Sequence, residues 1–214
     1  MAHRIRGLLT GIEGYTDLLL ESVEQSDQRE LAFRILESTS RIEGILADLQ
    51  HYNDPLEAHF HRVPAAAIAP DTMGALSDRE FDRVSITNSL GSETVLRADE
   101  SLLRQALLAL IRNALEADGA QATAVSLTTE RDMDGDCVLF RVRNFGSHLS
   151  HDASEPVFQA FYTTKSANLG LGLTLARRIA RIHRGDLVIS SRAEDAFTEF
   201  TLSIPILKDS ASAQ

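Results

Sequence analysis

Two glycines stand directly before a predicted helix in the C-terminal part of the chain. Gly170 and Gly172 lie in the run Asn168-Leu169-Gly170-Leu171-Gly172, and residues 171–184 then repeat apolar side chains at helical spacing. A helix N-terminus offers free backbone N–H groups and a positive dipole end to phosphate oxygens. Because glycine has no Cβ, the backbone can approach such an anion closely. This loop therefore predicts a phosphate-binding site.

A second candidate is an asparagine inside a long amphipathic helix. Residues 100–117 place their apolar side chains on one side, and Asn113 falls in the second half of the stretch. An amide oxygen suits Mg²⁺, a hard cation that keeps several waters and takes few protein ligands. Taken alone, an asparagine in a helix is more often a surface or capping residue, so the surrounding pattern has to carry this assignment.

A histidine close to the start of the chain could act as a nucleophile, although a histidine at such a position is otherwise usually inert. His3 opens a predicted helix over residues 2–24. Imidazole is largely neutral near pH 7 and nucleophilic, so it can accept a phosphoryl group. The other histidines that we considered are weaker candidates. His51 ends a predicted helix, where a positive charge favours the helix dipole. His59 and His61 are isolated in the linker, and His183 is interpreted as structural.

These residues need two kinds of element to position them. Residues 2–24 and 29–52 carry apolar side chains in steps of three and four, and the short polar break between them predicts an antiparallel helical hairpin. A lone hairpin buries little apolar surface, so two copies are expected to pair as a four-helix bundle. We therefore expect a homodimer.

The second region mixes strands and helices. Prolines 55, 64 and 70 place the linker near residues 53–62, which separates a hairpin domain over 1–54 from a second domain over 63–207. We expect strands near 83–88, 94–97, 122–130, 136–143, 186–191 and 197–204, and helices over 65–77, 100–117 and 171–184. Asp134-Gly135 indicates a hairpin turn. The expected fold class is α+β, with a two-layer α/β sandwich after the hairpin.

Composition narrows the class of protein. The net charge of −10 argues against a general nucleic-acid surface, which needs clustered Lys and Arg. No apolar run approaches the roughly 18 residues that span a bilayer. The single cysteine, Cys137, cannot form an internal disulfide, so we expect a reducing cytoplasm.

The order of these motifs resembles the catalytic core of two-component sensor histidine kinases. Residues 99–117 are similar to the N box, residues 142–149 to the first glycine box, residues 155–165 to the F box and the start of the ATP lid, and residues 168–177 to the second glycine box. Residues 3–19 resemble the H box, with His3, Arg6, Gly14 and Tyr15 in register. The resemblance implies the Bergerat-type ATP fold that gyrase, MutL and the Hsp90 chaperones share.

This resemblance also implies roles for single residues. Asn113 would coordinate the Mg²⁺ that bridges the ATP phosphates, and His3 would be the phosphorylated residue. Asn144 and Gly146 would lie at the adenine, Lys165 would reach a phosphate from the lid, and Gly170, Leu171 and Gly172 would form the phosphate loop. The cofactors implied are ATP and Mg²⁺, and the partner implied is the receiver domain of a response regulator.

Several positions depart from the family pattern. Arg4 replaces the acid that accepts the imidazole proton, and general-base assistance is typically worth about 10²–10⁴-fold, so we expect slow autophosphorylation. Gly7 replaces the residue used in dephosphorylating the regulator. Asn144 replaces an aspartate that receives the adenine amino group, and an amide makes the same hydrogen bond without the assistance of a charge. His148 and Asn168 replace glycines.

The resulting prediction is an ATP-dependent protein histidine kinase that phosphorylates His3 and passes the phosphoryl group to a response-regulator aspartate. The alternative is a kinase-derived histidine phosphotransferase, a relay or pseudokinase with degraded ATP binding. An ATP-binding serine kinase of the anti-sigma type would leave the long hairpin unexplained. Hydrolysis as the main activity is disfavoured, because Ala109 stands where ATPases of this fold carry a glutamate base. We expect the sensing part to be a separate chain or a domain outside an excised core.

Overall fold

The computed structural model describes residues 2–23, 26–53, 55–117, 125–145, 156–163, 169–192 and 197–207. The chain forms two compact units. One comprises Met1–Pro55 with Thr163–Leu171, and the other comprises Leu56–Tyr162 with Gly172–Gln214. Each unit is described by itself below.

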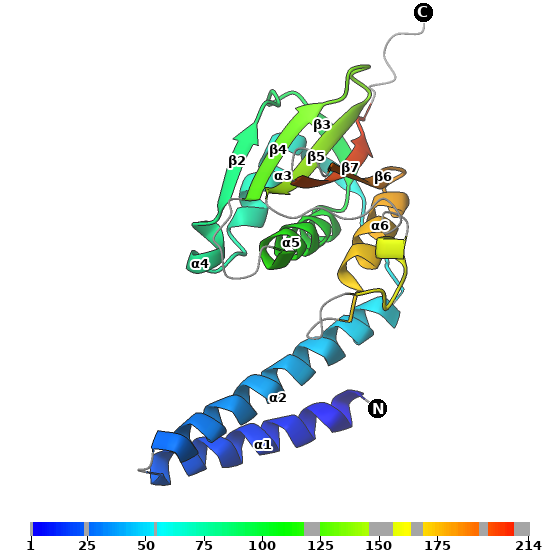
Figure 1. Cartoon of the computed structure of the whole chain (residues 1–214). Coiled ribbons are helices and arrows are strands. Elements are labelled where there is room, and N and C mark those ends of the chain that lie inside the picture. The colour runs from blue at the N-terminus through cyan, green and yellow to red at the C-terminus, as the bar shows by residue number, and fades with distance from the viewer. Residues whose placement is uncertain are drawn as a thin grey trace, which may run out of the picture. The chain divides into compact units, whose positions relative to one another are not determined.

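The first unit is built on a helical hairpin of α1 (Ala2–Ser22) and α2 (Ser26–Asn53) (Figure 1). The predicted hairpin is confirmed, although the second helix begins earlier than its apolar periodicity indicates. Asp27 supplies a negative charge to the first turn of α2, where the helix dipole favours it. The Arg29 guanidinium donates to the carbonyls of Leu20 and Val23, at 3.1 and 3.3 Å, and so closes the C-terminal end of α1.

The second unit is an α/β sandwich (Figure 1). Its elements are β1 (His61–Pro64), α3 (Ala65–Met73), α4 (Asp78–Phe81), β2 (Val84–Asn88), β3 (Val95–Ala98), α5 (Glu100–Ala117), β4 (Val125–Arg131), β5 (Cys137–Phe145), the 3₁₀ turn η2 (Pro156–Phe158), α6 (Gly172–Ile182), β6 (Asp186–Arg192) and β7 (Phe197–Pro205). A five-stranded sheet has the order β2-β4-β5-β7-β6, and only the β2–β4 pair is parallel. The antiparallel β1–β3 pair forms a separate small sheet.

The helices cover one face of the large sheet. Side chains alternate along β5, so that Val138, Phe140 and Val142 are fully buried while their neighbours are partly exposed. They belong to one hydrophobic core with Leu107 and Ile111 of α5. This alternation, which the sequence shows as a strand signal, places the core between sheet and helices.

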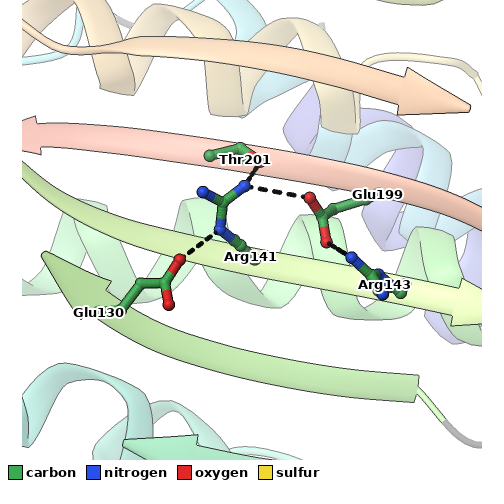
Figure 2. Close-up of polar contacts among 5 residues, drawn as sticks. All are labelled: Glu130, Arg141, Arg143, Glu199 and Thr201. Atoms are coloured by element: carbon green, nitrogen blue, oxygen red, sulfur yellow. Dashed lines mark hydrogen bonds and ion pairs between the residues drawn. The ribbon is translucent and has the colours of Figure 1, made fainter. Parts of the chain in front are cut away.

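A charged network ties strands together on the opposite face of the sheet (Figure 2). Glu199 of β7 accepts from Arg141 at 3.1 Å and from Arg143 at 2.7 Å, and Arg141 also donates to Glu130 of β4 at 2.8 Å. The hydrogen bond that Arg141 donates to Glu130, together with the charge of Glu199, holds the pKa of Arg141 above its ordinary value against the effect of burial. The network therefore links three adjacent strands.

Most predicted elements are confirmed, and two short ones were missed besides the three-residue turn η2. The turn at Asp134-Gly135 joins β4 to β5, with Gly135 at a φ of 74°. The missed elements are α4, which the capping box of Ser77 and Glu80 starts, and β1, which lies partly inside the stretch that we expected to be linker. The helix predicted over 65–77 ends at Met73. Segments of four residues are too short to show a period of their own.

Candidate functional site

The predicted metal ligand lies on α5, the central helix of the α/β unit. Asp99 caps this helix, since its Oδ1 accepts the backbone N–H of Leu102 at 3.0 Å. One side of α5 is fully buried in the core, through residues that include Leu107, Leu110 and Ile111. Asn113 is half-buried at the margin of that side. A rigid, well-packed helix therefore holds the amide in place.

The N-terminus of α6 packs against α5 one helical turn before Asn113. An ideal Cβ built on Gly172 would lie 3.7 Å from the Cβ of Ala109, which is an ordinary van der Waals contact. Because Gly172 is the first residue of α6, the free N–H groups of that helix begin beside α5. An amide oxygen and a helix N-terminus thus occur on neighbouring surfaces, as binding of a metal-bound phosphate requires.

A small anchor holds the start of α6 to the η2 turn. The hydroxyl of Thr174 donates to the carbonyl of Phe158 at 3.1 Å, and the Arg177 guanidinium lies 4.5 Å from the centre of the Phe158 ring. The Phe158 side chain is buried. Phe158 thus anchors the start of α6 to the η2 turn.

The rest of the glycine loop belongs to the other unit. Gly170 adopts a φ of 68°, a left-handed conformation that glycine enters at no steric cost, whereas the side chain of Leu171 is buried. Gly170 and Leu171 group with the hairpin, while Asn113, Asn144 and Gly172 lie in the α/β unit. The left-handed backbone conformation at position 170 is what favours glycine there.

Asn144 lies on β5, on the helix-covered side of the sheet, with an exposed fraction of only 1%. Its cross-strand neighbours are Val125 of β4 and Thr198 of β7. Thr198 is also buried, and its hydroxyl lies 3.3 Å from that of Ser191. The sequence analysis did not single out Thr198, because only the strand register brings it beside Asn144.

Four of the predicted or departing residues lie outside the described ranges: Gly146, His148, Lys165 and Asn168. His3 lies in α1 by its backbone, and its side chain is outside the description. In the described part of the chain, no three His, Cys, Asp or Glu side chains come together to hold a metal ion.

The helices of the described ranges include none that is both long enough and apolar enough to cross a bilayer.

Two family models match the chain. Residues 98–208 match the family described as histidine kinase-, DNA gyrase B- and HSP90-like ATPase. Residues 1–55 match the His Kinase A (phospho-acceptor) domain. The first match contains Asn113, Asn144 and Gly172, and the second contains His3.

Curated relatives match nearly the whole chain, including the regions of both family models. The signal transduction histidine-protein kinase AtoS of Escherichia coli strain K12 is 27% identical over 208 residues, which are 96% of this chain and 34% of the relative. The sensor histidine kinase ZraS of Salmonella typhi is 28% identical over 211 residues, which are 97% of this chain and 44% of the relative. The chain thus spans less than half the length of these two relatives.

Solved structures show the same architecture. Full-length ShkA in complex with AMPPNP has a TM-score of 0.75 and 25% identity, and the match covers 98% of this chain and 45% of ShkA. The histidine kinase ThkA in complex with the response regulator protein TrrA has a TM-score of 0.71 and 22% identity, over 96% of this chain and 60% of that chain.

Proposed function

The chain belongs to the family of histidine kinase-, DNA gyrase B- and HSP90-like ATPases and forms the catalytic core of a sensor histidine kinase, and we propose that it phosphorylates its own His3 from ATP. In this proposal the α/β unit binds the nucleotide and the hairpin carries the acceptor. The phosphoryl group then passes to an aspartate on the receiver domain of a response regulator.

The observation that carries this proposal is the packing of the α6 N-terminus against α5. The contact of Gly172 with Ala109 brings backbone donors within one helical turn of the Asn113 amide. Phosphate oxygens suit the donors, and Mg²⁺ beside Asn113 would neutralise the charge that develops on the transferred group. Asn144, buried under the same helices, would face the purine, with Gly146 beside it, and Lys165 with the Gly170–Leu171–Gly172 loop would meet the phosphates.

The acceptor step follows from the chemistry of imidazole. A ring nitrogen of His3 attacks the γ-phosphorus in line, a P–N bond forms, the bond to the bridging oxygen breaks, and ADP leaves. The ring then loses its N–H proton to solvent, because Arg4 can accept none. Ala109 offers no base to activate water, which favours transfer over hydrolysis.

The proposed partners follow from the roles that we assign to the two units. Large apolar side chains of the hairpin are exposed, which supports a homodimer through a four-helix bundle. The structural similarity to ThkA, solved with the response regulator TrrA, supports a receiver domain as the phosphoryl acceptor. We assign the sensing function to a separate chain or a further domain, in line with relatives that are more than twice as long.

A histidine phosphotransferase that no longer uses ATP is the competing function. The neutral Asn144 favours it, because this side chain is buried at a position where the family carries a charged acceptor. Asn144→Asp is the variant that separates the two. In a kinase it strengthens ATP binding by about tenfold through a charge-assisted hydrogen bond, whereas in a relay it changes nothing in phosphotransfer from a partner.

The direct test is incubation with γ-labelled ATP and Mg²⁺ of the wild type, His3→Ala and Asn113→Ala, with ATP affinity measured in parallel. We expect label on the wild type alone. His3→Ala should keep its ATP affinity, because it alters only the acceptor. Asn113→Ala should lose binding, since it removes the metal ligand.

Two results would contradict the proposal. Label that survives His3→Ala would remove the acceptor assignment. A folded wild-type chain that binds no ATP at millimolar concentration would favour the relay function instead.

A further inference from the structure

The linker between α2 and β1 is bound to the α/β unit through its backbone. Residues 55–60 form neither helix nor strand, yet the N–H of His59 donates to Oδ2 of Asp99 at 2.8 Å. The next side chain, Phe60, meets the ring of His183 edge-on, with the two centroids 5.2 Å apart and the planes at 63°. We call His59, Phe60, Asp99 and His183 the linker clasp.

Asp99 is the centre of the clasp. It is 7% exposed, and its two carboxylate oxygens accept from different segments: Oδ2 from the linker at His59, and Oδ1 from the first turn of α5 at Leu102. Its own N–H donates to Nε2 of His183 at 3.0 Å. One buried residue thus connects the linker, the start of α5 and the segment after α6.

The contacts of His183 indicate which ring nitrogen accepts a hydrogen bond and which one donates. A backbone N–H can only donate, so Nε2 must accept from Asp99. The Nδ1 atom lies 2.8 Å from the carbonyl of Ile179, which can only accept, so Nδ1 is the ring nitrogen that donates in this arrangement. Both nitrogens of this side chain, which is 4% exposed, are therefore satisfied.

The backbone after α6 fixes the ring in this position. Arg184 adopts a left-handed φ of 59°, and the N–H of Gly185 reaches back to the carbonyl of Ala180 at 2.9 Å, a Schellman arrangement. A side chain at Gly185 would collide with the backbone carbonyl of Ser203 on β7. The end of α6 is thus held against the sheet, and it presents His183 to Asp99 and Phe60.

The clasp joins the far ends of the two helices that carry the proposed phosphate site. Asp99 precedes α5, which bears Asn113 in its second half, and His183 follows α6, which begins at Gly172. Neither clasp residue lies at the nucleotide end of its helix. A change in the clasp should therefore affect how the chain leaves the α/β unit more than how that unit binds nucleotide.

We propose that the linker clasp is a positioning device that fixes the linker to the ends of α5 and α6 and thereby sets the rate at which the phosphoryl group reaches His3. This inference rests on the proposed function. A linker held at His59 and Phe60 leaves a shorter connection between acceptor and nucleotide, which raises their effective concentration for one another. His183 acts through the linker and touches no reacting atom.

The test compares three variants with the wild type. His183→Phe keeps an aromatic ring against Phe60 but removes the acceptor for the Asp99 N–H. His183→Gln keeps an acceptor near the position of Nε2. Ser77→Ala removes the exposed cap of α4, a helix outside the linker clasp, and so controls for a general loss of stability.

Three measurements are made on each: the single-turnover rate of label incorporation, the ATP dissociation constant, and hydrogen exchange at the amides of His59 and Asp99. We expect His183→Phe to lose protection at both amides and to be phosphorylated about tenfold more slowly, the factor for one buried hydrogen bond. Its ATP affinity should stay within about twofold. His183→Gln and Ser77→Ala should remain close to the wild type in rate.

Each outcome either supports or overturns the proposed role of the linker clasp. A His183→Phe chain that loses protection but keeps the wild-type rate would overturn the inference, as would equal losses in rate and affinity. Unchanged protection at His59 in His183→Phe would show that His183 does not help to hold the linker and would also overturn the inference. A wild type that binds no ATP contradicts the proposed function instead, and hydrogen exchange then still judges whether His183 holds the linker.

Discussion

The two units bury their apolar side chains in opposite ways. The α/β unit has a core of large side chains, in which Phe140, Phe200 and Leu107 are at most 1% exposed. In the hairpin the large ones are outside, with Leu8 at 69% and Tyr15 at 76%. The α/β unit therefore completes its own core, whereas the described hairpin leaves most of its apolar surface uncovered.

The side chains that are buried between α1 and α2 explain this difference. The buried positions of the described hairpin are Leu9 and Thr16 on α1 and Ala32 and Thr39 on α2, and within each helix the two are one heptad apart. Three of the four are small. The seam inside the hairpin thus uses small residues and leaves the large ones for an outer surface. Exposed apolar surface of this kind marks an interface, which supports the proposed homodimer.

The largest effect should come from opening a cavity in the α/β core. Phe140→Ala removes a fully buried ring and should lower the free energy of unfolding of that unit by about 3–5 kcal/mol. Denaturant unfolding followed by hydrogen exchange measures each unit separately. Leu18→Ala, at a position 62% exposed, is the hairpin control. Equal losses of protection in both units would contradict the division of the chain into two separate units.

The next effect concerns the outer surface of the hairpin. Leu8→Glu combined with Tyr15→Glu places charges where the proposed bundle needs apolar contacts, and should weaken the homodimer by roughly a hundredfold, about 2.7 kcal/mol. Sedimentation equilibrium measures the dimer constant. Val188→Glu, at a strand position of the α/β unit that is 51% exposed, adds a charge elsewhere and should leave it unchanged. A dimer that tolerates the hairpin charges would place the interface on another surface.

A smaller effect depends on pH and is confined to the α/β unit. Burial acts to raise the pKa of Asp99, but the hydrogen bonds from His59 and Leu102 outweigh it and hold the pKa below its ordinary value of 3.8. A lowered pKa contributes stability that is present above the ordinary value and lost as pH falls through the lower, folded-state value. At neutral pH, Asp99→Asn should cost about 1–2 kcal/mol.

The pH dependence of that difference is the sharper test. Measured by urea unfolding, the gap between wild type and Asp99→Asn should be constant above about pH 5 and shrink below about pH 4. Unfolding of the hairpin, followed by its helical signal, should not show this pH-dependent gap between the two proteins. A gap that grows on acidification would mean that the folded-state pKa is raised, and would contradict the assigned hydrogen bonds.

The smallest effects are two glycine exchanges, one in each unit. Arg184→Gly relieves the left-handed φ of 59° and should stabilise the α/β unit by about 1 kcal/mol. Gly14→Ala, in α1 with open space where the Cβ would be, should stabilise the hairpin by about 1 kcal/mol. Thermal unfolding followed by hydrogen exchange assigns each gain. A loss with Arg184→Gly would show that its side chain matters more than its backbone strain.

Local patterns in the sequence were enough to predict the hairpin, the helix that carries Asn113, the β4–β5 turn and the glycine loop. Each depends on neighbours within a few residues, such as the helical spacing of apolar side chains in 100–117 or the Asp-Gly pair at the turn. The strand β1 and the cap of α4 escaped notice, because four residues carry too little of any period.

The tertiary structure decided which distant residues meet. Thr198 lies beside Asn144 only because β5 and β7 pair in one register, and a shift by one residue would turn both to the other face. Gly172 packs on Ala109, and Asp99 binds a histidine 84 residues away. Such contacts depend on how helices and strands close over a shared core, so they are properties of the folded chain and not of any short stretch within it.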